Sequence, residues 1–264
     1  MNYVGVMGGI GNQLFQYAFS KHLELITGNQ SILFTSFYDK VAGFEGVTNR
    51  SFVLDKFGLE FTSKAGNITC SQILNEDDID SIESGVDNTY FHGYWQDKKY
   101  FMDVLDDIKS SFSLNEESHK GLNYIENEML TENSVSIHVR RGDYTNQANK
   151  DLFCELGKDY YVGALETIIE MIGEEVAVYV FSDDITFCKN LFKDCWNYKT
   201  VYMSDRKDYE DLYLMSVARH HIIANSTFGW WGSAVSKGGI TIAPPRWYKN
   251  RENPNLYLDN WIVL

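Results

Sequence analysis

The regular alternation of strand-like and helix-like segments in the second half of the chain restricts the fold more than any other feature. Short apolar runs occur at residues 135–139, 176–181, 200–203, 221–224 and 240–243. Helix-length segments separate them, at about residues 161–172, 185–192, 209–219 and 228–235. Strands that alternate with helices in this way form right-handed crossovers on a parallel sheet. The sequence therefore predicts an α/β fold, and such folds bind ligands at the carboxyl ends of their strands.

The first half begins with the same kind of unit and then becomes irregular. An apolar run at residues 3–7 leads into a glycine cluster and then into apolar residues at helical spacing from 14 to 26. A second strand is predicted at residues 32–34 and an amphipathic helix at about 101–112, whereas the acidic stretch 39–88 shows no clear pattern. A chain of 264 residues can hold two α/β halves. We place them at 1–130 and 131–264, with the seam near 115–134.

The composition excludes several classes of protein. Asp and Glu outnumber Lys and Arg by 37 to 23, which gives a net charge of −14 and argues against a general nucleic-acid binder or adhesion to an anionic membrane. No run approaches the roughly 18 apolar residues of a membrane-spanning helix, and no signal-peptide pattern opens the chain. The four cysteines lack the spacing of a zinc site, so free thiols in a cytosolic protein are expected.

Two adjacent arginines follow the first strand of the second half, in the run His138-Val139-Arg140-Arg141-Gly142-Asp143-Tyr144. His138 and Arg140 lie two residues apart and so share one face of the strand. Gly142 lets the chain turn, which could bring both guanidinium groups to one mouth. Guanidinium groups bind phosphates through paired hydrogen bonds, and two of them suit a diphosphate. The alternative is an Arg–Asp salt bridge that ends the strand, although burying such charges without a function is costly.

A glycine-rich loop, Gly8-Gly9-Ile10-Gly11-Asn12-Gln13, joins the first predicted strand to the first helix. It lacks the third glycine of the dinucleotide-binding fingerprint, which argues against an NAD-dependent oxidoreductase, and it lacks the lysine of a P-loop. Glycines at a helix start still let backbone N–H groups approach an anion. An ordinary tight turn explains the loop equally well.

Two carboxylates, Asp183 and Asp184, follow the most apolar strand of the chain. A carboxylate at this place can accept hydrogen bonds from ribose hydroxyls or from the edge of guanine. It can also bind a metal ion or cap the helix that follows. A metal-dependent transferase that uses Asp183 and Asp184 is therefore an alternative hypothesis for the function.

The run Asn225-Ser226-Thr227-Phe228-Gly229-Trp230-Trp231-Gly232-Ser233 combines small polar residues with two tryptophans. Hydroxyls and amides at the start of a helix can bind phosphate. The indoles could stack on a base or a sugar, but core packing is the usual place for tryptophan. The aromatic content of 15% also leaves open a non-catalytic carbohydrate-binding module, which would not need the two arginines.

Taken together, these segments resemble the α-1,2-fucosyltransferase family, whose members use GDP-fucose. The glycine-rich opening matches over residues 8–18, and the strand-end motif at 138–144 is the most specific part of the match. Residues 225–232 add a third piece. Phe91-His92-Gly93-Tyr94-Trp95-Gln96 with Tyr100-Phe101 looks like a fourth. The resemblance covers residues 5 to about 248 in order.

The resemblance implies a GT-B-like fold of two Rossmann-like domains, with the acceptor side in 1–130 and GDP-fucose binding in 131–264. It implies an inverting transfer of L-fucose to the 2-hydroxyl of a galactose-terminated glycan, with no metal or other cofactor required. The expected partners are the nucleotide-sugar donor and the galactoside acceptor. The expected location is the bacterial cytoplasm, with peripheral contact at the inner membrane face if the acceptor is lipid-linked.

The resemblance and the chemistry of the motifs together predict the site residues. Arg140 is expected to stabilise charge on the leaving oxygen, and Asp143 is a candidate base, with orientation of the arginines as an equal alternative. The expected donor-binding residues are Gly9, Gly11, Asn12, His138, Arg140, Arg141, Asp183, Asp184, Asn225, Ser226, Thr227 and Phe228. The expected acceptor-binding residues are Gln13, Gln16, His92, Tyr94, Trp95 and Gln96.

Overall fold

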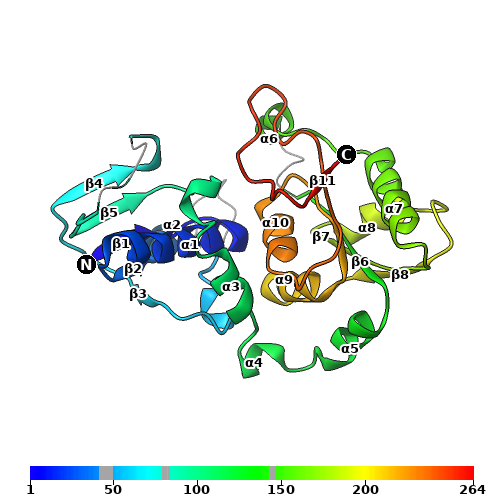
Figure 1. Cartoon of the computed structure of the whole chain (residues 1–264), viewed down its shortest axis with the longest axis horizontal. Helices are drawn as coiled ribbons and strands as arrows, with labels where there is room; N and C mark the ends of the chain where they lie inside the picture. The colour runs from blue at the N-terminus through cyan, green and yellow to red at the C-terminus, as the bar shows by residue number, and fades with distance from the viewer. Residues whose placement is uncertain (42–49, 79–81, 83, 143–146) are drawn as a thin grey trace. The chain divides into compact units, whose positions relative to one another are not determined.

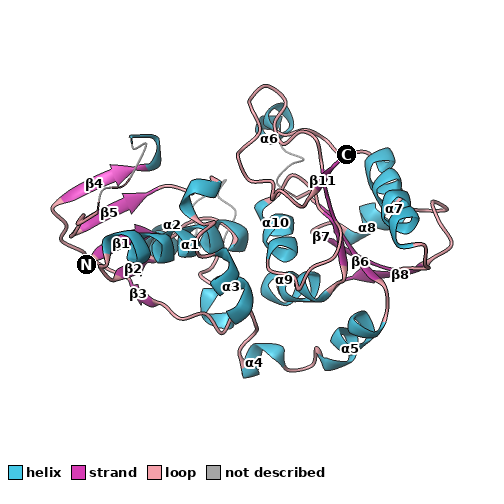
Figure 2. Ribbon diagram, in the orientation of Figure 1, coloured by secondary structure: helices cyan, strands magenta, loops and turns pink. Residues whose placement is uncertain are grey.

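The computed structural model describes residues 1–41, 50–78, 82, 84–142 and 147–264, and these form two compact units. The first unit is Met1–Ser113 and the second is Leu114–Leu264. Each contains a parallel sheet with helices packed against it (Figures 1 and 2). This arrangement of two Rossmann-like α/β units is the GT-B-like architecture predicted from the sequence.

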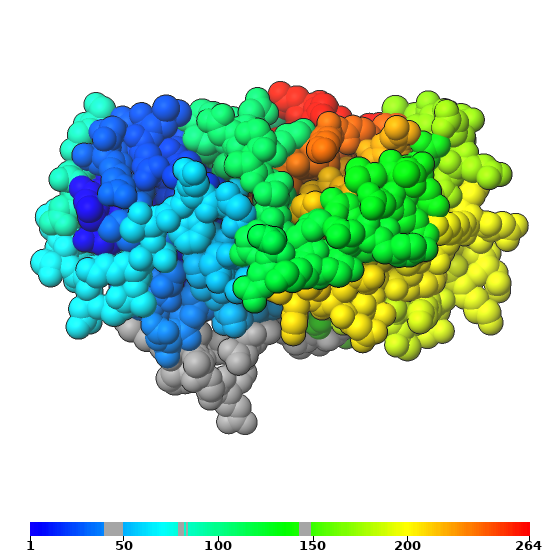
Figure 3. Space-filling view, turned by 90° about the horizontal axis from the view of Figure 1, so that it is seen from below, coloured from blue at the N-terminus to red at the C-terminus, as the bar shows by residue number. Residues whose placement is uncertain are grey.

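The division between the units falls earlier than the predicted boundary at residue 130. The segment in between carries two short helices, α4 (Glu116–His119) and α5 (Asn123–Thr131). Both belong to the second unit, where the Tyr213 hydroxyl donates to Glu126 and the Lys199 ammonium to Glu128. Figure 3 shows this green segment lying along the yellow surface of the second unit. The polar composition of the segment made it look like a linker, but its contacts anchor it.

The first unit is built on a five-stranded parallel sheet in the order β3-β2-β1-β5-β4. Its strands are β1 (Asn2–Gly5), β2 (Ser31–Phe34), β3 (Thr62–Lys64), β4 (Gln72–Asn75) and β5 (Thr89–His92). Its helices are α1 (Ile10–Thr27), α2 (Ser36–Val41) and α3 (Leu105–Ser111), with 3-10 turns η1 (Leu54–Lys56), η2 (Glu76–Asp78) and η3 (Lys98–Tyr100). The edge strands β3 and β4 are largely exposed, so the acidic stretch that contains them carries no apolar pattern.

The long helix α1 follows from the glycines at its two ends. Gly8 adopts a left-handed φ of 81°, and Gly9 is the residue before the first helical turn. Gly28 ends the helix with a left-handed φ of 69°, and its N–H donates to the carbonyl of Glu24. A side chain would strain both left-handed positions. The glycine loop thus places the start of α1 at the carboxyl end of β1.

The second unit has a six-stranded parallel sheet in the order β11-β10-β9-β6-β7-β8. Its strands are β6 (Ser134–Val139), β7 (Ala177–Ser182), β8 (Lys199–Met203), β9 (His220–Ile222), β10 (Thr241–Ala243) and β11 (Ile262–Val263). Its further helices are α6 (Gln147–Leu152), α7 (Lys158–Ile172), α8 (Ile185–Leu191), α9 (Asp208–Val217) and α10 (Thr227–Ala234). Strands β6 to β10 and helices α7 to α10 confirm the predicted alternation, whereas the two-residue β11 is too short for a sequence signal.

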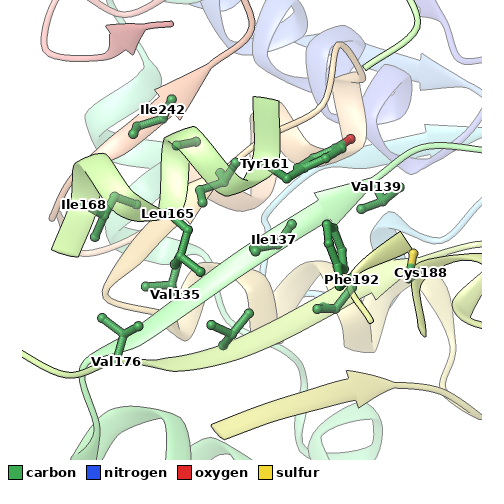
Figure 4. Close-up of a cluster of buried hydrophobic side chains, with 14 residues drawn as sticks. Val135, Ile137, Val139, Tyr161, Leu165, Ile168, Val176, Cys188, Phe192 and Ile242 are labelled. Carbon is green, nitrogen blue, oxygen red and sulfur yellow. The ribbon is translucent and has the colours of Figure 1, made fainter. Parts of the chain in front are cut away.

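Alternation along β6 divides its side chains between the two faces of the sheet. Val135, Ile137 and Val139 belong to the buried apolar cluster formed with α7 and α8, as Figure 4 shows. Residues of the other parity face the opposite side, where α9 and α10 pack (Figure 1). His138 lies on that side, because a Cβ on Gly229 of α10 would meet its ring. The strand therefore directs His138 and, two residues later, Arg140 away from the apolar core.

Candidate active site

His138 is buried at the carboxyl end of β6, against the first turn of α10. Its ring lies 5.2 Å from that of Phe228, and a Cβ on Gly229 would come within 2.7 Å of its Nδ1. Within the described residues, that Nδ1 has no hydrogen-bond partner. Burial, and then the charge of Arg140, lower the pKa of His138 to about 3. The imidazole is therefore neutral and carries an unused polar atom, which is typical of a functional site.

Asp183, directly after β7, holds the two arginine residues in place. Its Oδ2 accepts from Nη1 of Arg140 at 2.6 Å, and its Oδ1 accepts from the backbone N–H of Arg141 at 2.9 Å. Burial raises the pKa of Asp183, but the Arg140 charge and the backbone N–H groups of Gly142 and Arg141 outweigh it and hold the pKa below its usual value. A Cβ on Gly142 would lie only 2.3 Å from Asp183. The turn therefore requires glycine, as the motif suggested.

The two guanidinium groups have different environments. Arg140 forms the salt bridge with Asp183 and its side chain is 17% exposed. Arg141 stacks on the ring of Phe187 in α8, with 3.9 Å between the guanidinium carbon and the ring centre. Both line one pocket. The salt bridge considered as the alternative is therefore present, and it also orients Arg140 beside a cavity.

The pocket has a volume of about 260 Å³ and opens at the carboxyl ends of the second unit's strands. Among its described lining residues four are basic and one is acidic, although the chain as a whole carries −14. Such a pocket concentrates an anionic ligand. Its lining is Val139, Arg140, Arg141, Asn149, Lys150, Phe153, Cys154, Glu155, Leu156, Tyr161, Phe187, Ala224, Asn225 and Lys249. Sequence analysis did not single out Lys150 or Lys249, because isolated lysines carry no motif.

The segment before α10 divides between ligand-facing and structural residues. Asn225 reaches the pocket, but its amide donates to the carbonyls of Cys154 and Trp247 at 2.9 and 2.8 Å. Ser226 caps α10 by accepting from the Phe228 N–H. The first turn of α10 faces His138 through Phe228 and Gly229. Trp230 and Trp231 are fully buried in the core, which was the expected place for them.

Asp184 has a structural role that the sequence left open. Its Oδ1 accepts from the N–H of Phe187 at 2.9 Å and so caps α8. This is the capping role that the sequence left open, and donor binding by Asp184 stays a prediction. The metal-dependent alternative, which would use Asp183 and Asp184, stays a hypothesis that the response of the activity to EDTA tests. Asp143, the candidate base, lies outside the described residues.

Asp211, which the sequence analysis did not single out, has an unusual environment in the second unit. It lies in the first turn of α9, and its Oδ1 is buried without a hydrogen-bond partner in the described part of the chain. Burial, reinforced by Glu210 and Asp208 and opposed by Arg206, raises its pKa to about 7. Carboxylates with raised pKa values are enriched at functional sites, but Asp211 is not among the residues that line the described pocket. No motif signals Asp211, because it lies in an acidic run with Asp205, Asp208 and Glu210.

In the first unit, most of the predicted acceptor amides serve the fold instead. Gln13 accepts from the Val53 N–H and donates to the carbonyl of Ser51. Gln16 accepts from the Met7 N–H at 3.0 Å and donates to the carbonyl of Gly93 at 3.1 Å. Both glutamines are fully buried. Their predicted role in acceptor binding is therefore revised, because both ends of each amide are committed to the backbone.

The remaining predicted residues of the first unit lie at the carboxyl ends of its strands. Trp95 is fully buried and stacked on Phe19, so it is a core residue and not a sugar contact. His92 and Tyr94 are exposed. Gln96 donates to Oδ1 of Asn12 at 3.1 Å. Gly9 and Gly11 lie at the start of α1. A Cβ added to Gly9 would lie 3.9 Å from the guanidinium group of Arg50.

A cationic pocket at the strand ends of one of two Rossmann-like units defines the site of a GT-B-like glycosyltransferase. The whole chain, residues 1–264, matches the sequence profile of glycosyl transferase family 11, and the chain belongs to this family. It is 30% identical to the O-antigen biosynthesis glycosyltransferase WbnK of Escherichia coli, over 99% of this chain and 100% of that protein. It is 28% identical to an alpha-1,2-colitosyltransferase of Escherichia coli, over 93% and 91% of the two chains.

Solved structures share the fold at low sequence identity. NodZ alpha-1,6-fucosyltransferase co-crystallized with GDP superposes with a TM-score of 0.56 at 12% identity, covering 89% of this chain and 92% of NodZ. A mutant of Arabidopsis thaliana FUT1 in complex with GDP gives 0.54 at 14% identity, covering 96% and 72%. These similarities support the GT-B-like fold. Across the described residues, none of the helices is long and apolar enough to cross a membrane.

Proposed function

We propose that the enzyme transfers L-fucose from GDP-β-L-fucose to the 2-hydroxyl of a galactose-terminated glycan, with inversion at the anomeric carbon. The observation that carries this proposal is the arrangement around Asp183, which fixes Arg140 at the cationic pocket beside the neutral His138. The basic residues of this pocket would attract the negatively charged diphosphate of a nucleoside diphosphate sugar.

The reaction breaks the bond between the anomeric carbon and the diphosphate oxygen, and that oxygen keeps the electron pair. Arg140 would stabilise the resulting charge, since a preorganised donor of this kind contributes roughly 2.7–4 kcal/mol to the transition state. Its salt bridge with Asp183 supplies the preorganisation. Arg141, stacked on Phe187, would bind the second phosphate.

The acceptor oxygen attacks from the opposite face and loses its proton. Asp143 is the proposed base, because it follows the arginines in the same motif. The neutral His138 and the Phe228 ring would contact the nucleoside. Arginines replace a divalent cation in this scheme, so EDTA is expected to leave activity unchanged, whereas loss of activity restored by Mn²⁺ would favour the metal-dependent alternative.

A second donor deserves a direct test, because one relative is an alpha-1,2-colitosyltransferase. Colitose is L-fucose without the 3-hydroxyl, so the same arginine pair would serve either GDP-sugar. Because the two donors differ only in that hydroxyl, the enzyme would distinguish them by a hydrogen bond to it.

The experiment compares GDP-fucose with GDP-colitose on a panel of galactose-terminated acceptors, followed by linkage analysis of the product. The proposal expects an α-1,2-linked fucoside and a kcat/KM for GDP-fucose at least tenfold above that for GDP-colitose. A reversed donor preference would replace fucose by colitose. Turnover of GDP-fucose without transfer to any galactoside would contradict the acceptor assignment.

A further inference from the structure

One carboxylate of the first unit binds two consecutive backbone amides. The N–H groups of Tyr94 and Trp95 both donate to Oε2 of Glu76, at 2.7 and 2.8 Å. Strands β4 and β5 are parallel neighbours with Asn75 opposite His92, so Glu76 leaves its strand directly beside Gly93. A Cβ on Gly93 would lie 2.5 Å from that of Glu76. The close approach of the two segments therefore depends on glycine at this position.

The backbone held by Glu76 has an uncommon conformation. Trp95 has a left-handed φ of 58°, which costs roughly 1–2 kcal/mol for a residue with a side chain. The indole is fully buried and stacks face to face on Phe19, with 3.7 Å between ring centres and an interplanar angle of 4°. Burial of so large a ring offsets the backbone cost. The reversal of the chain turns Trp95 into the core and leaves its neighbour Tyr94 outside.

Tyr94 is consequently an aromatic side chain on a fixed backbone, 43% exposed. On one side of it, the Gly93 carbonyl accepts from the buried amide of Gln16. On the other side, Trp95 is anchored in the core. Tyr94 thus offers an exposed aromatic face whose backbone neighbours on both sides are fixed.

The surroundings of Tyr94 place it at the same edge of the sheet as the glycine loop. Strands β1 and β5 are parallel neighbours with Val4 opposite Phe91, so the segment after β5 and the glycine loop after β1 leave the sheet side by side. The Tyr38 hydroxyl donates to the carbonyl of Gly8 at 3.0 Å. Tyr94 therefore lies near the start of α1, where the amides of Gln96 and Asn12 pair. An aromatic face beside amide groups suits a pyranose. The apolar C–H groups of the sugar would pack on the tyrosine ring, and its hydroxyls would form hydrogen bonds with the amides.

We infer that Glu76 is a positioning residue of the acceptor site, and that its carboxylate fixes the backbone that presents Tyr94 as a platform for the acceptor sugar. The inference rests on the proposed transferase function. A platform that is already ordered loses less conformational freedom when the sugar binds. Glu76 itself faces the backbone and would not touch the acceptor.

The test measures steady-state kinetics with GDP-fucose and lactose for the variants Glu76→Ala, Glu76→Gln and Tyr94→Ala. Both alanine variants are expected to raise the KM for lactose about tenfold, while the KM for GDP-fucose and its hydrolysis without acceptor stay within twofold of the wild type. Glu76→Gln keeps one carbonyl oxygen for the two N–H groups and should lie in between. Asp77→Ala, an exposed acid in the same turn, is the matched control and should change nothing.

The double variant Glu76→Ala/Tyr94→Ala separates positioning from general stability. If Glu76 acts through Tyr94, the double variant has the same lactose KM as Tyr94→Ala alone. Multiplicative effects, or a loss of Tm with an unchanged lactose KM in Glu76→Ala, would overturn the inference. Failure of the wild type to turn over GDP-fucose would instead contradict the proposed function.

Discussion

The two units present motif residues of similar composition at the carboxyl ends of their parallel strands, but they use them differently. In the second unit, Arg140 and Arg141 reach a pocket and His138 keeps an unused ring nitrogen. In the first unit, the amides of Gln13 and Gln16 are buried and bound to the backbone at both ends. A motif thus mixes residues that meet a ligand with residues that build the loop around it, and only the hydrogen-bond partners tell them apart.

The largest expected effect comes from removing the guanidinium group that Asp183 orients. Arg140→Ala should lower kcat about 1,000-fold, because one preorganised donor is worth roughly 2.7–4 kcal/mol in the transition state. Arg140→Lys should recover only part of this loss, since an ammonium cannot form the same paired contacts. Fucose transfer is measured at saturating donor.

Two controls accompany this comparison. Arg251→Ala removes an exposed arginine of the same unit and should leave kcat unchanged. Asp183 keeps its backbone donors in Arg140→Ala, so the Tm should fall by only a few degrees. A kcat near that of the wild type would show that Arg140 ends the strand without serving the reaction.

The next effect concerns stability in the first unit. Gln13→Ala would leave the Val53 N–H and the Ser51 carbonyl without partners, which should lower the free energy of unfolding by about 3 kcal/mol. Thermal unfolding measures the change, and the KM values for donor and acceptor should stay within twofold. Gln30→Ala, which removes an exposed amide bonded to Thr62, is the control with an expected change below about 0.5 kcal/mol. A normal Tm with a raised KM would restore Gln13 as a ligand contact.

The sequence was most informative where apolar periodicity and strand-end motifs coincide. Strands β6, β7, β9 and β10 are buried over all or nearly all of their residues, so their apolar runs and the residues after them were predictable. Strands β3 and β4 are exposed edge strands of three and four residues, and they leave no pattern. The boundary at 113 was likewise hidden, because polar helices such as α5 are held by hydrogen bonds to distant residues.

Side-chain roles were less predictable than side-chain positions. Spacing placed His138, Arg140 and Asp183 together, but it could not show that Asp183 binds Arg140 while Asp184 caps a helix. Trp95 illustrates the same limit, since a left-handed backbone angle reverses which neighbour faces solvent. Such roles depend on contacts between segments far apart in the chain, and a motif does not contain those contacts.

The smallest expected effect concerns Asp211 of the second unit, and it tests whether this carboxylate, like the His138 ring nitrogen, lacks a protein partner because it serves the donor. Asp211 has a pKa raised to about 7 in the folded protein, above its ordinary value. The folded state therefore binds the proton more tightly than the unfolded state, so stability falls as the pH rises from about 4 to 7 and then levels off. Asp211→Asn removes this penalty and should be about 2 kcal/mol more stable than the wild type at pH 8, with little difference at pH 4.

Thermal unfolding across this pH range measures the stabilisation, and calorimetric titration with GDP measures its functional cost. If the unpaired Oδ1 serves the donor, Asp211→Asn should bind GDP about tenfold more weakly while it unfolds at a higher temperature, because a hydrogen bond to a charged group is worth roughly 1.5–3 kcal/mol. Asp159→Asn changes an exposed acid in the first turn of α7 and should lose a few tenths of a kcal/mol through the helix dipole. If Asp211→Asn is instead less stable than the wild type at pH 8, the wild-type carboxylate has a partner within the protein. Asp211 would then be a structural residue like Gln13.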